Sequence, residues 1–519
     1  MSSPILHATR RVGVITGRIL IYALIFAGLS LLFAAIGIRI FFGKISVGQM
    51  LLNLVSVETD GGGGSLVWIG ILLVVVLPLL ITVGIAVWHY SWLRKRFRNP
   101  SERRPRRSSW FVRTVSTVAV AGLVVGGTTA FSSTVGMADY IKSGNSQYDI
   151  DDYYVEPTIT SDKDQRNLVV IYLESGEATL ADDQLFEKNA FEPLEDVTQA
   201  KDGWQSVKDF QQYDGGGWTM SGITSTQCGI PLKGMDSAVG SGALNKLGSD
   251  VESYLGGITC LGDVLDEHGY KNVFLGGANG KFSAKDTFLE GHGYSDVKGL
   301  TDWRAAGEPQ SHFRSDWGLS DKSLMGHAKN EIDELHAESK KSGQPFNLSM
   351  LTLDTHEPAH IYDYCDQDTE SEVTSMFFCS MTQVAGFVDY MEEKGYLEDT
   401  AVVIMGDHLK HMGGGDAFHE ELDNHPNRTI FNRFWIPGDD KKTKLRPRVD
   451  QLNMSPTLLE AAGLKVKKHE AGLGVSAFTS AIPEDSAQAM DPDAYIDLLR
   501  SRSARFFAKA WAGADIPKE

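Results

Sequence analysis

The chain has 519 residues, which is long enough for more than one domain, and its formal net charge at pH 7 is −18. Apolar residues are concentrated in roughly the first 140 positions, where basic residues outnumber acidic ones, so the remainder of the chain is strongly acidic. This charge argues against a nucleic-acid partner for the remainder.

Three uncharged apolar segments dominate the N-terminal part, at residues 19–38, 66–88 and 114–137. Each provides the roughly 20 residues that a helix needs to cross a bilayer. One such run is also typical of a buried core helix, but three in succession leave little polar surface for a globular domain. The first run has no small-residue cleavage pattern, so we expect an anchor and not a removable signal peptide. Residues 1–138 are therefore predicted to be a membrane domain with three transmembrane helices.

The basic residues predict the orientation of these helices. Nine of them, from Arg94 to Arg113, lie between the second and third segments against one acid, Glu102, whereas only Arg39, at the very end of the first segment, and Lys44 lie between the first and second. The arginine run is also compatible with nucleic-acid binding, but its position between two membrane helices favours a role in topology. The positive-inside rule places the N-terminus in the cytoplasm and everything after about residue 140 across the membrane.

All four cysteines, Cys228, Cys260, Cys365 and Cys379, lie in the exported part. An even number outside the cytosol indicates two disulfides, for which three pairings are possible. We favour the pairing of sequence neighbours, Cys228–Cys260 and Cys365–Cys379. A zinc cluster is the alternative, but the spacings contain no C-x-x-C pair.

The exported part alternates apolar runs with amphipathic ones. Residues 139–166 are polar and are predicted to be a linker, and residues 167–519 are predicted to form one exported domain. The alternation predicts an α/β domain with a largely parallel sheet. The predicted strands are 169–174, 272–275, 346–353, 401–405 and 429–436, and the predicted helices are 261–268, 322–341, 371–394 and 455–462.

Two of these strands end in possible metal ligands. Glu174 follows the first apolar run, and Asp407 and His408 follow another after Gly406. Ligands bind at the carboxyl ends of strands in open α/β sheets, so we expect these groups at one edge. The Asp-His pair alone is more typical of an ordinary loop.

A glycine-rich turn at residues 215–217 precedes Thr219. Thr219 is compatible with a plain helix N-cap or with a metal-activated nucleophile. With two carboxylates and an imidazole it would complete a four-ligand set for one divalent cation, manganese first, with zinc or magnesium as alternatives.

Eight short segments of the exported part carry a family resemblance. They are 172–175 (Tyr-Leu-Glu-Ser), 218–222 (Trp-Thr-Met-Ser-Gly), 227–232, 277–280, 285–286, 313–321, 352–358 and 406–408. Together they resemble the membrane phosphoglycerol transferases of osmoregulated periplasmic glucans, relatives of lipoteichoic acid synthases in the alkaline phosphatase/sulfatase superfamily. The resemblance covers about residues 165–465 and implies a fold of that superfamily, whereas the membrane part matches only in kind.

The resemblance implies roles for individual side chains. Thr219 aligns with the family's nucleophile, and Glu174, Asp407 and His408 align with its metal ligands. His356 aligns with a histidine that contacts the phosphoglycerol group.

Further positions are expected to bind substrate or to support the site. Lys285 stands where the lipoteichoic relatives carry an arginine near the phosphate. Arg314 and Asp316 lie in a family motif near the site, and the alternative for Arg314 is a salt bridge with Asp316 or Asp321. Trp317 is expected to pack in the core.

A second metal at His411 or His419 is left open, although solvent-facing loop residues are the favoured reading of both histidines.

On this resemblance the chain is a phosphatidylglycerol-dependent transferase of the bacterial inner membrane. The implied reaction has two steps: Thr219 takes the phosphoglycerol group from the lipid, and a hydroxyl of a periplasmic glycan, osmoregulated periplasmic glucan first, then accepts it. The sequence does not determine the oligomeric state.

Three other functions are weighed against this one. A phosphoethanolamine transferase acting on a periplasmic glycan or on lipid A would use a similar threonine and metal set. A sulfatase would need a C-x-P-x-R context, whereas Cys228 is followed by Gly-Ile-Pro-Leu. A catalytically silent membrane-anchored binding protein would have no reason to keep the Glu, Thr, Asp and His quartet.

Overall fold

The computed structural model describes residues 4–43, 64–98, 106–144, 146–234, 253–411, 417–423, 425–438 and 444–512. These residues form two compact units, one built from the N-terminal helices up to Ala138 and one that begins at Asp139.

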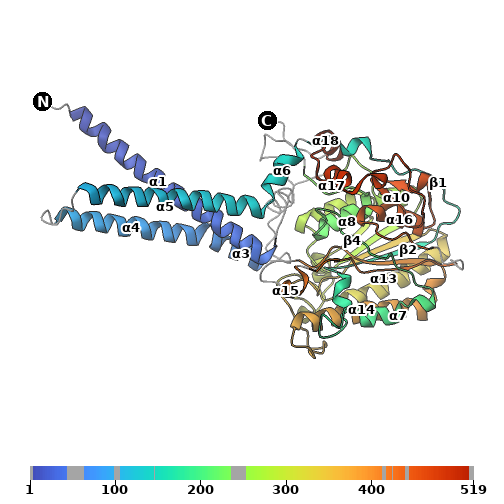
Figure 1. Cartoon of the computed structure of the whole chain (residues 1–519). Coiled ribbons are helices and arrows are strands. Elements are labelled where there is room, and N and C mark those ends of the chain that lie inside the picture. The colour runs from blue at the N-terminus through green and yellow to red at the C-terminus, as the bar shows by residue number, and fades with distance from the viewer. Residues whose placement is uncertain are drawn as a thin grey trace. The chain divides into compact units, whose positions relative to one another are not determined.

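The described part of the N-terminal unit is helical. Its described helices are α1 (Pro4–Phe41), α3 (Gly64–Ile71), the π-helical turn η1 (Leu72–Val76), α4 (Leu77–Arg98) and α5 (Arg106–Thr134), and α6 (Met137–Ser143) follows (Figure 1). Within these residues, three stretches are long and apolar enough to cross a membrane: Ile15–Phe41, Val67–Arg94 and Trp110–Thr134. The three predicted apolar helices are therefore confirmed.

Local chemistry explains two features of this unit. Pro78 cannot donate a backbone hydrogen bond to the preceding turn, and the π-helical turn lies directly before it. Helices α1 and α5 pack closely at Gly28 and Gly127, because a Cβ atom on Gly127 would overlap the carbonyl oxygen of Gly28. Glycine at a crossing point is typical of membrane helices, which associate through close backbone packing.

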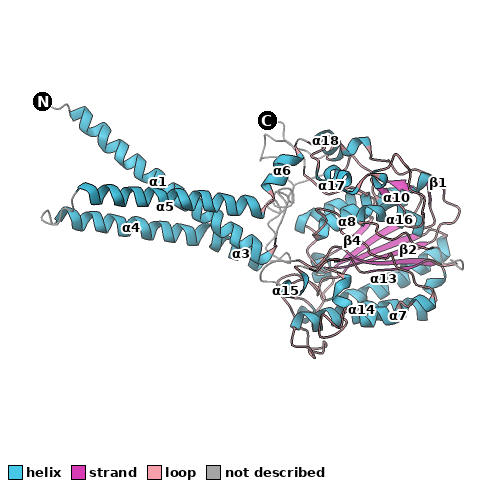
Figure 2. Cartoon of the chain, in the orientation of Figure 1, coloured by secondary structure: helices cyan, strands magenta, loops and turns pink. Residues whose placement is uncertain are grey.

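The second unit is built around a sheet, drawn in magenta in Figure 2. Its six strands of described residues have the order β4-β3-β5-β2-β6-β7. All neighbouring strands are parallel except β7, which is antiparallel to β6. The predicted α/β class with a largely parallel sheet is confirmed. The strands are β2 (Asn167–Leu173), β3 (Lys271–Gly276), β4 (Asp296–Lys298), β5 (Phe346–Leu351), β6 (Thr400–Gly406) and β7 (Asn432–Trp435).

Helices cover both faces of this sheet, as Figure 1 shows. One face carries α7 (Glu192–Val197), α13 (Asp321–Ser342) and α14 (Glu372–Glu393), and the other carries α8 (Thr219–Cys228), α10 (Leu261–Glu267) and α16 (Met454–Ala461). Strand β2 contributes Val169 and Ile171 to one apolar core and Val170 and Tyr172 to the other. Burial on both faces explains why its sequence is a continuous apolar run.

Smaller elements complete the second unit. They are β1 (Ile159–Ser161), α11 (Lys285–Gly291), α12 (Leu300–Ala305), α15 (His419–Leu422), β8 (Lys465–Val466), β9 (Glu470–Ala471), β10 (Gly474–Val475), α17 (Pro492–Arg500) and α18 (Ala504–Ala510).

The segment 139–166 differs from the linker that we predicted. Ile150 is fully buried, β1 pairs antiparallel with β8, and Val155 forms a bridge with Gly472. Its tyrosines pack their rings against the core while their hydroxyls keep the composition polar. Composition alone therefore does not reveal that this segment packs at an edge of the folded unit.

Both predicted disulfides are present. Cys228–Cys260 joins the end of α8 to the start of α10, and Cys365–Cys379 joins the loop after β5 to α14. The zinc alternative is excluded, because no thiol remains free among the described residues.

Candidate active site

The site begins with the pairing of β2 and β6. The two strands are parallel and Leu173 pairs with Gly406, so Glu174 and Asp407 follow at the same level of the sheet edge. Gly406 and Gly176 approach so closely that a Cβ atom on either would overlap the backbone of the other. Glycine is therefore required where the two chains leave the sheet.

Glu174, Asp407 and His408 converge at this edge. One ligand atom from each lies within 4.8 Å of the others, and all three side chains are buried. His408 Nε2 is 3.5 Å from Glu174 Oε1 and 3.6 Å from Asp407 Oδ2. The loop that begins after Gly406 thus lets two adjacent residues face one point.

The hydrogen bonds of Asp407 and His408 use one ligand atom of each side chain and leave the other atom unpaired. Asp407 Oδ1 accepts from the backbone N–H groups of Ser175 at 2.9 Å and of His408 at 2.8 Å. His408 Nδ1 lies 2.7 Å from the Leu409 carbonyl oxygen, so it carries the proton and Nε2 is unprotonated in the neutral ring. Asp407 Oδ2 and His408 Nε2 are buried without any hydrogen-bond partner. Buried polar atoms are rarely left unpaired, and these two fit the ligands of a divalent cation.

The electrostatics of the cluster point the same way. Burial, followed by the nearby charge of Glu174, raises the pKa of Asp407. Burial also opposes ionisation of Glu174, but His356 and His408 outweigh it and lower the pKa of that carboxyl. Two buried carboxylates this close need positive charge between them, which a divalent cation supplies.

Thr219 is the first residue of α8, and its Oγ1 donates a hydrogen bond to Glu174 Oε2 at 3.2 Å. The N-cap position belongs to Trp218, which makes no side-chain cap, so the alternative of Thr219 as N-cap is wrong. Helix α8 packs directly on the ligand loop, because a Cβ atom on Gly222 would overlap the carbonyl oxygen of Asp407. This packing explains the run of small residues in the helix.

His356 lies in the loop after β5. Its ring is 3.8 Å from the Trp317 ring, centroid to centroid, and its Nδ1 is 2.8 Å from the Glu357 carbonyl oxygen. Burial lowers the pKa of His356, although the charge of Glu174 opposes the shift. Trp317 is buried as expected, and it supports this imidazole.

Arg314 holds that loop and has no donor left for a substrate. Its Nε and Nη2 donate to the Asp316 carboxylate at 3.0 and 2.9 Å. Nη1 donates to the carbonyl oxygens of Asp354 (3.1 Å) and His356 (3.0 Å), and Nη2 donates to that of Pro358 (2.7 Å). These bonds use all five N–H groups of a side chain that is 0% exposed. The geometry supports the salt-bridge alternative with Asp316, and a direct substrate contact by Arg314 is excluded.

Lys285 begins α11 and is buried. Burial lowers its pKa, while the charges of Glu174, Asp286 and Asp407 oppose that shift. Within the described parts of the chain its ammonium has no hydrogen-bond or ion-pair partner, so it remains available to an anionic ligand.

His411 is half-buried, and so less exposed than the solvent-facing residue that we expected. Its ring lies 4.8 Å from that of His408, and burial, with His408 and His356 adding to it, lowers its pKa well below the usual value. His419 starts α15 and is not a member of the ligand cluster found among the described residues.

An ion pair that the sequence did not reveal joins the two loops of the site. Lys410, two residues after His408 of the ligand cluster, pairs with Glu357, next to His356, and Lys410 is 4% exposed. The partners are far apart in sequence, and no local motif marks either one.

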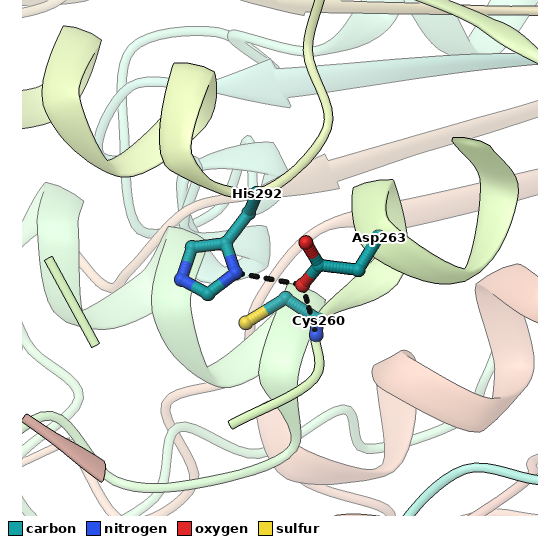
Figure 3. A group of neighbouring side chains, drawn as sticks. All are labelled: Cys260, Asp263 and His292. Carbon is teal, nitrogen blue, oxygen red and sulfur yellow. Dashed lines mark hydrogen bonds and ion pairs between the residues drawn. The ribbon is translucent and has the colours of Figure 1, made fainter. Parts of the chain in front are cut away.

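A second cluster contains Cys260, Asp263 and His292 (Figure 3). Cys260 is disulfide-bonded, and both ring nitrogens of His292 are engaged, with Asp263 Oδ2 at 2.7 Å and the Tyr254 carbonyl oxygen at 2.9 Å. No unpaired ligand atom remains on the imidazole, so this cluster braces the start of α10 and does not form a metal site.

Comparison with known proteins gives consistent results. Two curated relatives are both named phosphoglycerol transferase I: one from Shigella flexneri is 30% identical over 354 residues, and one from Escherichia coli O139:H28 is 29% identical. Each alignment covers 66% of this chain and 43% of the relative, so the chain spans less than half the length of these relatives.

Solved structures with a similar fold are more distant. A Vibrio parahaemolyticus protein of the alkaline phosphatase superfamily has 22% identity and a TM-score of 0.46, covering 67% of this chain and 79% of that one. A lipoteichoic acid synthase from Listeria monocytogenes has 14% identity and a TM-score of 0.46, covering 66% and 80%.

The family comparison extends over most of the second unit. Residues 166–464 match the sulfatase family, and they include β2, α8 and β6 with every side chain of the ligand cluster. More than half of the chain is matched in this way, and the chain therefore belongs to the sulfatase family.

Proposed function

We propose that the chain transfers phosphoglycerol from phosphatidylglycerol to a hydroxyl of a periplasmic glycan. The observation that carries the proposal is the threonine hydroxyl held on Glu174 beside the buried ligand cluster of Asp407 and His408. The name of the relatives, phosphoglycerol transferase I, supports the donor group. The three apolar helices would keep the chemistry at a bilayer, where such a donor resides.

The ligand cluster fits one divalent cation. Glu174, Asp407, His408 and the hydroxyl of Thr219 would hold it, and when bound it would lower the pKa of the hydroxyl and neutralise charge on the phosphoryl oxygens. A set of oxygens with one imidazole favours manganese in our proposal, with zinc or magnesium as alternatives.

In the first step Thr219 acts as the nucleophile. Its proton already points to a carboxylate oxygen, Glu174 Oε2. Oγ1 forms a bond to the phosphorus of phosphatidylglycerol, the bond from phosphorus to the diacylglycerol oxygen breaks, and the threonine proton ends on that oxygen. A phosphothreonine diester carrying glycerol remains on the chain.

In the second step a glycan hydroxyl attacks the same phosphorus. The bond to Thr219 Oγ1 breaks, and the threonine oxygen takes up the proton that the acceptor loses. Two steps let one site receive a membrane lipid first and a water-soluble acceptor second. Osmoregulated periplasmic glucan is the acceptor we propose.

Two cationic or polar groups are available for the phosphoryl oxygens. Lys285 has an unengaged ammonium, and His356 is held in a loop at the same edge of the sheet. Arg314 and Asp316 bind each other through two hydrogen bonds. We therefore propose that they act on the substrate only by holding His356 in position.

The proposed topology places the N-terminus in the cytoplasm and the second unit in the periplasm. Two disulfides support an oxidising compartment for that unit. The loop between α4 and α5 is rich in basic residues, which supports its placement on the cytoplasmic side.

Mass spectrometry of the Thr219 peptide tests the proposal directly. The full-length chain is incubated with manganese in nanodiscs containing phosphatidylglycerol, quenched with acid and digested. We expect a glycerophosphate adduct on Thr219 that disappears on addition of a glucan acceptor. Thr219→Ala removes the adduct, whereas the matched variant Thr224→Ala keeps it, because the Thr224 hydroxyl lies in the same helix without a hydrogen-bond partner.

The same experiment separates the neighbouring functions. An ethanolamine-phosphate adduct formed only with phosphatidylethanolamine would replace this proposal by a phosphoethanolamine transferase. No adduct with either lipid, in a chain that folds and binds manganese, would favour the silent binding protein.

A further inference from the structure

Arg39 lies in the last turn of α1, and its side chain is exposed. Nε donates to Thr134 Oγ1 at 2.9 Å, and Nη2 donates to Ser133 Oγ at 3.1 Å. Both hydroxyls belong to α5, and Thr134 is fully buried. Neutral hydroxyl groups therefore hold the guanidinium in place against the neighbouring helix.

Among the described residues of its own unit, this positive charge has no carboxylate to pair with. Residues 4–43, 64–98 and 106–138 contain no aspartate or glutamate. The two hydroxyls accept from two of the five guanidinium N–H groups, and the described residues provide no acceptor for the other three. A fixed guanidinium with free donors is suited to the oxygens of a phosphate group.

The depth of Arg39 in the bilayer follows from where the apolar part of α1 ends. The stretch that is long and apolar enough to cross a membrane runs from Ile15 to Phe41. Its 27 residues are about 40 Å of helix at about 1.5 Å per residue, which exceeds the roughly 30 Å of the hydrocarbon core. Arg39 is two residues from the end of this stretch, so we place it at the level of the lipid head groups.

Its position is unusual for a basic residue. On the proposed topology Arg39 lies at the non-cytoplasmic edge, where the positive-inside rule disfavours arginine. A basic side chain that is retained there and also clamped by two hydroxyls is better explained by a specific anionic ligand than by topology.

We propose that Arg39, positioned by Ser133 and Thr134, binds the phosphate of an anionic phospholipid in the outer leaflet. The site rests on the geometry of α1 and α5 alone. Only the identity of the lipid rests on the proposed function: if that function holds, the bound lipid is phosphatidylglycerol that awaits transfer. Phosphate is the recognised chemistry, and the lipid, not a soluble phosphate, is the source we propose because of the depth of the side chain.

Native mass spectrometry of the full-length chain, released from nanodiscs of phosphatidylglycerol and phosphatidylcholine, measures the binding. The Thr219→Ala background prevents turnover during the measurement. We expect Arg39→Gln to weaken retention of phosphatidylglycerol about tenfold, the loss of one charge-assisted contact. Thr134→Val should give a smaller loss, and Arg39→Lys should recover part of it. Lys201→Gln, which removes an exposed charge from the second unit, should have no effect.

Three results would overturn the proposal. The first is wild-type retention of phosphatidylglycerol by Arg39→Gln. The second is equal loss of both lipids in that variant, and the third is displacement of the lipid by millimolar glycerol phosphate. If Arg39→Gln does not insert and fold, the test is the retention of phosphatidylglycerol by Thr134→Val compared with that of the Thr219→Ala background chain. Adduct formation at Thr219 is read separately in the parent chain, so failure of the lipid site and failure of the transfer reaction are distinguishable.

Discussion

Replacement of Arg314 by glutamine should reduce transfer while leaving metal binding intact. The side chain makes five hydrogen bonds and is fully buried, and three of its acceptors are carbonyl oxygens of the loop that carries His356. Glutamine cannot span these acceptors, so the loop loses its support. The proposed metal ligands follow β2 and β6 and are not bonded to Arg314.

The magnitude follows from the contacts. Breaking a buried ion pair by removing one partner costs about 3–5 kcal/mol. The second unit has about 380 residues, so its unfolding entropy at about 2.1 cal/mol/K per residue is about 0.8 kcal/mol/K. The expected drop in Tm is therefore about 4–6 °C. A shift of His356 by about 1 Å would lower the transfer rate about 100-fold.

The assay compares three variants of the full-length chain in detergent. Arg314→Gln is measured for Tm, for manganese affinity and for the rate of adduct formation at Thr219. Arg314→Lys should behave in the same way, because a single ammonium cannot replace the planar guanidinium. His356→Ala should lose the rate but keep the Tm. A transfer rate within twofold of wild type in Arg314→Gln, at a reduced Tm, would refute the positioning role.

Three further outcomes are expected. Gly222→Ala should lower manganese affinity and the transfer rate at least about 100-fold, because its Cβ would push α8 off Asp407. The control Gly326→Ala in α13 adds a Cβ that meets no atom within 4 Å, so it should change neither quantity. Equal metal titrations for the two variants would contradict the packing argument. Chelation with EDTA should abolish adduct formation and lower Tm, and manganese should restore both; a chelated chain that still forms the adduct would rule out the metal. Burial, with Asp321 adding to it, raises the pKa of Asp354 well above its usual value, so this carboxyl favours folding below the pKa of the unfolded chain and its contribution is lost as pH rises through the folded pKa. Asp354→Asn should therefore raise Tm between pH 7 and 8 more than at pH 4; thermal scans showing the opposite trend would exclude this explanation.

The sheet edge and its ligands were predictable because both depend on local patterns. A strand buried on both faces is a continuous apolar run, and Glu174 and Asp407 follow two such runs directly. The cysteine pairing also followed from position along the chain. The direction of β7 was not predictable, since an edge strand has the same composition whether it runs parallel or antiparallel.

Contacts between distant loops account for what the sequence could not show. Arg314 selects carbonyl oxygens some forty residues away, and nothing in its own segment distinguishes that role from a substrate contact. Lys410 and Glu357 meet only because β5 and β6 flank β2. His411 follows His408 by three residues, but its partial burial depends on the packing of the whole edge.

The Cys228–Cys260 bond has a consequence for when the protein becomes competent. It ties down the far end of α8, the helix that presents Thr219 at its near end. Thiols remain reduced in the cytosol, so on the proposed topology a newly made chain gains this brace only after it has crossed the membrane. If the proposed function holds, the threonine would thus be fully seated only on the side of the proposed acceptor, which would protect the inner leaflet from premature head-group removal.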